Sequence, residues 1–261
     1  MAYPVPYLAF CKALLFFVSF TLVSAPVRAE QDVGQAANDP TALLQAHNFQ
    51  DFYTPNYHKD SGATGNTVQY RGAFPFKLGN VDNIARITVP YLTDSPSGET
   101  GFSDFTLFDL AIFTEDWGRW GVGAVAALPV GDEGVGSGQW AVGPAIGFTA
   151  ASGKLLWGAF NQNLFSVAER FDGPDVNISN IQPIISYGLN DGWSIGTSEM
   201  NVIYNWDESE FTSLPLGLKL AKIVHFDKTP VQFSVQYERN FYDDRVAPRD
   251  TIGFIVKVLV P

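Results

Sequence analysis

The sequence has few of the residues on which catalysis and metal binding most often depend. It contains one cysteine, Cys11, and three histidines, His47, His58 and His225. Cys11 lies in an N-terminal segment that we expect to be removed, which would leave no disulfide and no thiol. A nucleophile needs a base within hydrogen-bond reach, and no histidine here shares a strand end with an obvious serine partner. The sequence therefore predicts a protein that is not an enzyme, with no catalytic residues, no metal site and no cofactor.

The sequence also lacks an uncharged apolar run, beyond its first residues, that could span a membrane as a helix. The run at 13–24 follows Lys12 and is too short to span, and Val27-Arg28-Ala29 offers the residues that a signal peptidase reads. The alternative of a retained anchor is disfavoured because the run ends early. We expect a signal peptide at 1–29, a flexible periplasmic leader at 30–41 and one domain at 42–261.

Basic residues are scarce, with 16 Lys and Arg against 27 Asp and Glu. Loss of residues 1–29 would remove Lys12 and Arg28 and leave 14 basic against 27 acidic residues, a net charge of -13. A chain that binds nucleic acid normally carries a basic surface. The balance therefore argues against a nucleic-acid partner.

The sequence does contain long segments in which apolar and polar residues alternate. Val231, Phe233 and Val235 alternate with Gln232 and Ser234, and a period of two places the two sets on opposite faces of a strand. Only helices and closed barrels satisfy all backbone groups inside a bilayer. The pattern therefore predicts an all-β, transmembrane antiparallel up-and-down β-barrel of about twelve strands, an even number as in bacterial barrels. The predicted strands are 42–53, 66–77, 83–93, 103–114, 118–130, 138–151, 154–166, 176–188, 192–206, 211–225, 229–242 and 250–260.

The connections between these strands alternate in length, as expected when short turns face the periplasm and longer loops face outward. Tryptophans near the turns and aromatic residues near the loops fit two membrane interfaces better than the core of a soluble β-sandwich. The short connections are 77–82, 114–117, 151–153, 189–192 and 226–228, and the longer ones are 54–65, 93–102, 131–137, 167–175, 207–210 and 243–249.

The two faces of the strands predict a lipid side and a lumen side. The strand at 103–114 stays ambiguous, with either Asp104 and Thr106 or Ser103 and Asp109 inside. Polar interiors occur in both open channels and plugged barrels, so both alternatives remain. The expected lipid face comprises Val68, Tyr70, Phe74, Phe76, Ile87, Val89, Tyr91, Leu214, Leu216, Leu218, Leu220, Ile252, Phe254, Val256, Val258 and Val260. The expected lumen comprises Gln69, Arg71, Arg86, Thr88, Asn161, Asn163, Asn180, Gln182, Glu199, Asn201, Lys219, Gln232, Gln236, Glu238 and Lys257.

Two loop features suggest ligands less strongly. The stretch 131–138 resembles a phosphate loop but leads into a strand, so we expect a flexible loop. Carboxylates at 207–210 and 243–244 could bind divalent cations, although a solvated acidic rim, bridged by cations to lipopolysaccharide, is the favoured interpretation.

Several short motifs, in order and spacing, resemble a family of bacterial outer-membrane transporters named for the meta-cleavage pathway of phenol degradation. The resemblance covers most of the expected mature chain and implies an outer-membrane β-barrel with a transport role, without agreed substrate or catalytic residues. The motifs are Phe102-Ser103-Asp104, Gly138-Gln139-Trp140-Ala141-Val142-Gly143-Pro144, Gly173-Pro174-Asp175-Val176-Asn177, Gln182-Pro183, Asn190-Asp191-Gly192-Trp193 and Pro215-Leu216-Gly217.

We therefore expect a Gram-negative outer-membrane channel for passive transport of small solutes, with aromatic or organic-acid compounds as candidates. Its expected partners are outer-membrane lipid, lipopolysaccharide and the small-molecule solute. The alternatives are a closed structural barrel and, third, an outer-membrane hydrolase.

Overall fold

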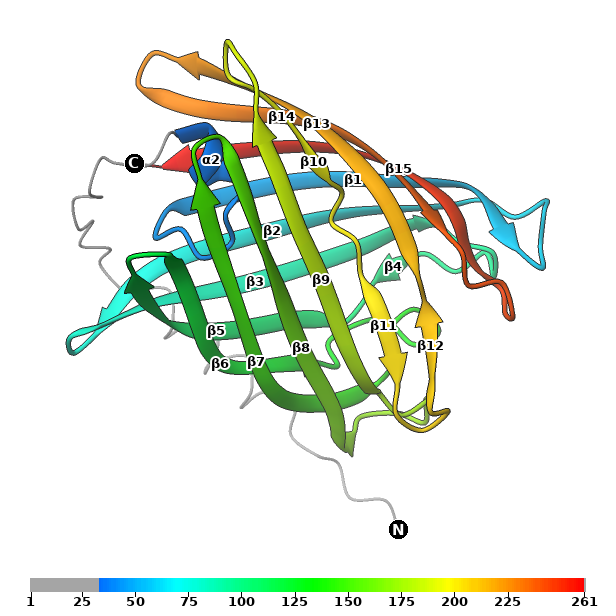
Figure 1. Cartoon of the computed structure of the whole chain (residues 1–261). Helices are drawn as coiled ribbons and strands as arrows, with labels where there is room; N and C mark the ends of the chain where they lie inside the picture. The colour runs from blue at the N-terminus through cyan, green and yellow to red at the C-terminus, as the bar shows by residue number, and fades with distance from the viewer. Residues whose placement is uncertain (1–32, 261) are drawn as a thin grey trace.

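The computed structural model describes residues 33–260, which form a twisted cylinder of strands with one short helix (Figure 1). Within this range no helix has both the length and the apolar character needed to cross a membrane. The elements are α2 (Val33–Asn38), β1 (Gln45–His58), β2 (Gly65–Leu78), β3 (Val81–Asp94), β4 (Gly101–Phe102), β5 (Phe105–Glu115), β6 (Gly118–Leu128), β7 (Gln139–Ser152), β8 (Leu155–Glu169), β9 (Asn177–Gly188), β10 (Trp193–Thr197), β11 (Val202–Asn205), β12 (Glu210–Ser213), β13 (Pro215–Phe226), β14 (Thr229–Asn240) and β15 (Ala247–Val260).

The sheet closes on itself, because the last strand pairs with the first. Antiparallel pairing of β15 with β1 begins at Gln45 opposite Val260. When the interrupted strands described next are counted as single strands, each strand pairs with its neighbours in sequence. β10 and β11 together form one interrupted strand, as do β12 and β13, while the two residues of β4 add to the edge of β3. The predicted closed, twelve-stranded antiparallel barrel is confirmed.

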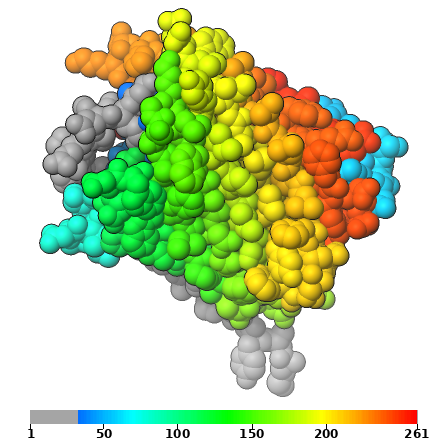
Figure 2. All heavy atoms as spheres, in the orientation of Figure 1, coloured from blue at the N-terminus to red at the C-terminus, as the bar shows by residue number. Residues whose placement is uncertain are grey.

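Alternation along the strands separates an apolar outside from the inside. Leu218 lies opposite Tyr237 and both are exposed on the outer surface, whereas the neighbouring pair of Lys219 and Gln236 points inward. The same rule resolves the ambiguous strand, since Phe108 is buried inside β5 and Asp109 is exposed outside. In Figure 2 the side chains of β7 to β13 form a continuous outer wall.

The two ends of the barrel differ, as predicted. Connections at 79–80, 116–117, 153–154, 189–192 and 227–228 are short and lie at the end that holds α2 (Figure 1). The turn at 189–192 needs left-handed backbone at Asp191 (φ 55°) and Gly192 (φ 73°), a conformation that favours glycine and tolerates aspartate. The opposite end carries the longer loops.

The region before the barrel differs from expectation. Residues 33–41 were expected in a flexible leader, but α2 and the following turn pack inside the barrel, with Asn38, Asp39 and Thr41 buried. That prediction is wrong for 33–41. The predicted signal peptide at 1–29 and the first residues of the leader lie outside the described range.

The predicted strand 192–206 is interrupted at 198–201. Here the backbone leaves the sheet ladder and bonds to other groups: Ser198 N–H donates to the Gly217 carbonyl (3.2 Å), and Glu199 N–H donates to Oε1 of Gln236 (3.4 Å). Irregular backbone at membrane depth is tolerated where protein or a cavity supplies such partners. The interruption turns the Glu199 side chain into the lumen.

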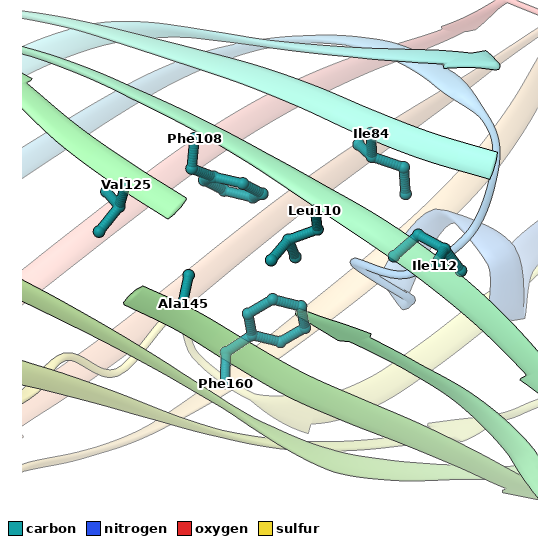
Figure 3. Packing of buried hydrophobic residues seen from close by; sticks show 7 residues of the cluster. All are labelled: Ile84, Phe108, Leu110, Ile112, Val125, Ala145 and Phe160. Atoms are coloured by element: carbon teal, nitrogen blue, oxygen red, sulfur yellow. The ribbon is translucent and has the colours of Figure 1, made fainter. Parts of the chain in front are cut away.

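Part of the inner surface is apolar, which the amide-rich lumen prediction did not include. Figure 3 shows seven side chains from β3, β5, β6, β7 and β8 gathered inside the barrel. Leu110 is 0% exposed and Phe160 2% exposed. We call this cluster the apolar wall; it consists of Ile84, Phe108, Leu110, Ile112, Val125, Ala145 and Phe160.

Candidate functional site

Four basic side chains face the interior from the polar half of the barrel. Arg71 comes from β2 and Lys257 from β15, and both lie opposite Asn48 of β1 in the strand register. Arg86 of β3 and Lys219 of β13 occupy inward positions on either side of them. We call Arg71, Arg86, Lys219 and Lys257 the basic cluster. Its members come from strands far apart in sequence, so only closure of the barrel brings them together.

Glu199 is the carboxylate at the centre of this cluster. Nη1 of Arg71 lies 2.7 Å from Oε2 of Glu199, and Nε2 of Gln50 donates to the same oxygen at 3.0 Å. Glu238, the next inward carboxylate, accepts a hydrogen bond from Nε2 of Gln236 at 3.0 Å. Four basic and two acidic side chains therefore line this section, which leaves an excess of two basic groups.

Among the described residues, several donors of the basic cluster have no hydrogen-bond partner. Nε of Arg71 is buried without a hydrogen bond. Arg86 lies with its guanidinium carbon 4.4 Å from the ring centroid of Phe108, a cation–π contact at the border with the apolar wall. Within residues 33–260, neither Arg86 nor Lys219 forms a direct hydrogen bond or ion pair, whereas Lys257 donates to the Ala37 carbonyl at 2.7 Å.

A cavity of about 100 Å³ lies between the basic cluster and the chain at 36–44. All four basic side chains and Glu199 contribute to its lining. Leu44, Ile84 and Ile184 supply apolar surface to the same lining. The cavity therefore combines cationic and aliphatic side chains.

Residues 33–44, which we call the inner segment, narrow the lumen at the short-turn end. Asp39 accepts hydrogen bonds from Arg119 Nη2 (2.6 Å) and Thr149 Oγ1 (2.9 Å). Asn38 donates to Ser194 Oγ at 3.2 Å. These contacts reach β6, β7 and β10, so the segment is attached around the barrel wall.

The structure places most of the predicted lumen residues on the inner face. Gln69 donates to Gln50 at 2.5 Å, Asn180 donates to Asn201 at 2.9 Å, and Gln232 contacts the inner segment at Asn38. The inward set is Gln69, Arg71, Arg86, Thr88, Asn180, Gln182, Glu199, Asn201, Lys219, Gln232, Gln236, Glu238 and Lys257.

Asn161 and Asn163 do not face the lumen, so that part of the prediction is wrong. Asn161 lies opposite Ile146, which is 54% exposed on the outer surface. Asn163 Nδ2 donates to Asn161 Oδ1 (2.6 Å), and Asn163 Oδ1 accepts from Ser179 Oγ (2.5 Å). The amides bond to each other on the outer face, because the alternation that turns Phe160 of the apolar wall inward turns Asn161 and Asn163 outward.

Sequence reasoning missed Asn48 and Gln50, which are buried on the inner face of β1. Asn48 and Gln50 alternate with His47, Phe49 and Asp51 in the sequence, and this alternation could have assigned them to the inner face. The role of Asp39 had no comparable signal, because residues before a first strand carry no period that would assign them to a face.

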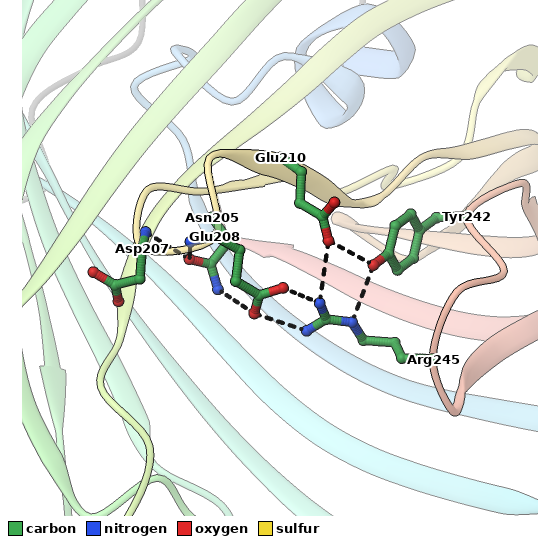
Figure 4. Close-up of polar contacts among 6 residues, drawn as sticks. All are labelled: Asn205, Asp207, Glu208, Glu210, Tyr242 and Arg245. Carbon is green, nitrogen blue, oxygen red and sulfur yellow. Dashed lines mark hydrogen bonds and ion pairs between the residues drawn. The ribbon is translucent and has the colours of Figure 1, made fainter.

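Two of the acidic residues of the outer loops, Glu208 and Glu210, are paired with an arginine (Figure 4). Arg245 forms ion pairs with Glu208 and Glu210 and donates to the hydroxyl of Tyr242 at 3.2 Å. Hydrogen bonding from Arg245 lowers the pKa of Glu208 below its usual range. In the part of the chain that the structure describes, no three His, Cys, Asp or Glu side chains are arranged to hold a metal ion. The carboxylates act as loop contacts.

The loop at 131–138 is held in place, contrary to the expectation of a flexible loop. The Asp104 carboxylate accepts hydrogen bonds from Gly131 N (3.2 Å), Ser137 N (2.7 Å) and Ser137 Oγ (2.6 Å). A Cβ at Gly136 would lie 2.5 Å from Asp104 Oδ1, so glycine permits this close approach. Asp104 therefore binds loop backbone.

The histidine contacts do not form a catalytic arrangement. His47 Nδ1 lies 2.8 Å from the Tyr70 hydroxyl on the outer face, and His58 Nε2 lies 2.8 Å from the Asn240 carbonyl. His225 is exposed next to a short turn. Among the contacts of residues 33–260, no serine is bonded to these rings.

No family model and no curated protein matches the chain. Among solved structures, it is similar to an outer membrane channel from Pseudomonas putida F1, at 13% identity and a TM-score of 0.61, over 83% of this chain and 94% of that one. The outer membrane phospholipase of Salmonella typhi (12% identity, TM-score 0.45, 90% and 99% covered) and a porin of Rh. blastica (8%, 0.29, 83% and 99%) are less similar. The first likeness shows a shared barrel fold.

Proposed function

We propose that this chain is a channel of the bacterial outer membrane that passes small solutes without energy coupling. The barrel stands with its apolar outer face against lipid, its short turns in the periplasm and its loops toward lipopolysaccharide. The exposed leucines Leu216 and Leu218 on β13 fit hydrocarbon, where a charged side chain would cost roughly 2–4 kcal/mol. The fold shared with the Pseudomonas putida channel supports the same role.

The observation that carries the proposal is the composition of the interior. A barrel needed only as a structural element could fill its lumen with side chains that satisfy one another. Here Arg86 and Lys219 line a cavity, and neither forms a hydrogen bond or ion pair within residues 33–260, which fits a surface that solutes contact. Aromatic or organic acids are the solutes that the phenol-pathway resemblance suggests, and their negative charge suits the basic cluster.

Single-channel conductance of the purified protein in a planar bilayer tests the proposal. We expect discrete conductance steps that persist in the absence of any energy source. Protease protection shows whether the barrel has inserted into the bilayer. A barrel that inserts and yet never conducts would be a closed structural barrel. Assaying the same preparation for phospholipid hydrolysis tests the enzymatic alternative, and we expect no fatty-acid release.

A further inference from the structure

We propose that the lumen cavity is a binding site for the carboxylate of a small aliphatic organic acid. This inference rests on the proposed channel function and names the chemical class of its solute. The carboxylate would lie among Arg71, Arg86 and Lys219, and the hydrocarbon part would lie against Leu44, Ile84 and Ile184.

Charge is the first argument. The basic cluster exceeds Glu199 and Glu238 by two groups, and Asp39, which also lines the cavity, is paired with Arg119. The chain as a whole, in contrast, carries 27 acidic against 16 basic residues. In the part of the chain that the structure describes, Arg71 is the member of the cluster that bonds directly to Glu199. Charges in a water-poor interior interact more strongly than at the surface, so this section attracts an anion and disfavours a cation.

The unused donors are the second argument. Buried polar groups are nearly always hydrogen-bonded, and one without a partner destabilises the protein. Within residues 33–260, Nε of Arg71 is buried without a hydrogen bond, and the guanidinium of Arg86 lies over the Phe108 ring and forms no hydrogen bond or ion pair. Guanidinium groups match the two oxygens of a carboxylate in geometry. A bound carboxylate would satisfy donors that the protein leaves open.

Shape and polarity limit the rest of the ligand. The aliphatic side chains that line the same cavity would be poor neighbours for a hydrated inorganic anion and good ones for a short alkyl chain. A cavity of about 100 Å³ is smaller than the ~150 Å³ cavity that accepts benzene. An aromatic acid would therefore enter only with displacement of the inner segment, so the structure favours acids of the size of butyrate.

Calorimetric titration of the detergent-purified protein with butyrate tests the site independently of transport. We expect saturable binding of butyrate at one site, with higher affinity than chloride. Butylammonium should not bind. In Lys219→Gln and Arg86→Gln proteins, affinity should fall by about tenfold or more, the usual effect of losing a charged hydrogen bond. Lys222→Gln is the matched control, because Lys222 lies on the outer face of the same strand, near Trp193. It should bind as the unaltered protein does.

The outcomes separate this inference from the proposed function. Equal loss in Lys222→Gln and Lys219→Gln, or equal binding of chloride and butyrate, would overturn the carboxylate site. Conductance without butyrate binding would overturn it too and leave the channel standing. Binding in a protein that never conducts would contradict the channel and place the site in a closed barrel. For each variant, resistance to unfolding in cold SDS shows that the barrel is folded. Lys219→Arg keeps the positive charge and should bind butyrate, unlike Lys219→Gln.

Discussion

Arg119 and Asp39 form an ion pair of 2.6 Å that connects β6 to the inner segment. The Asp39 side chain is 1% exposed, and its other carboxylate oxygen accepts hydrogen bonds from Thr41 and Thr149. A buried carboxylate with this many donors has a fixed position. The relationship implies that one buried aspartate holds the segment that narrows the lumen.

Replacement of Asp39 by Asn should loosen the inner segment and widen the channel. The change removes the charge from a buried ion pair, and breaking such pairs costs about 3–5 kcal/mol when one partner stays buried, less here because Arg119 is partly exposed. We expect larger single-channel conductance in planar bilayers. Asp82→Asn, in the exposed pair with Lys77, serves as the control and should conduct as before.

Ion selectivity should follow the charge of the lumen. Arg71→Gln should move the reversal potential in a salt gradient toward cation selectivity, and Glu199→Gln should move it toward anion selectivity. Arg239→Gln removes a positive charge from the outer face and should leave the potential unchanged. Equal shifts in all three would show that the basic cluster does not line the permeation path.

The apolar wall should contribute more to stability than the outer leucines. Leu110→Ala should lower the free energy of unfolding by about 2–5 kcal/mol, because it leaves a cavity in a packed interior. Leu218→Ala should cost less, since Leu218 is 65% exposed and lipid fills the space left by its side chain. Urea unfolding in lipid vesicles compares the two, and equal losses would contradict a packed inner wall.

The outer loop contact should depend on pH. Arg245 lowers the pKa of Glu208, so the stabilisation is complete above the unfolded pKa of glutamate and is lost as pH falls through the lowered folded value. Amide hydrogen exchange of 206–210, corrected for its intrinsic pH dependence, should show less protection at the acid end of a titration from pH 6 to pH 3. Arg245→Gln should remove the pH-dependent step; its persistence would assign the step to another group.

Asp109 should be a source of instability. It lies on the outer face between Ala85 and Ala124, where a carboxylate meets hydrocarbon. Asp109→Ala should raise the free energy of unfolding, by less than the roughly 2–4 kcal/mol assigned to Lys or Arg at the midplane. The same urea measurement applies, and a loss of stability would indicate that Asp109 has a partner in the membrane.

The positions of strands were accessible from sequence because alternation is local. Gln232, Gln236 and Glu238 were assigned to the inner face from neighbouring residues alone, and the register with β13 and β15 places them there. On β8 the same reasoning failed. Polar side chains occupy both faces around Asn161, Gln162 and Asn163, so the local pattern could not say which face was inside.

By itself, the sequence determined the number of strands, their antiparallel order and the difference between the two ends, because period-two alternation and turn residues act over a few positions. Tertiary structure alone decided what the lumen contains. Arg71, Glu199 and Lys219 meet across the barrel, and Asp39 is buried against β6 and β7. Such contacts depend on which strands face each other once the barrel has closed. No local pattern in the chain encodes which residues from distant strands will lie close together.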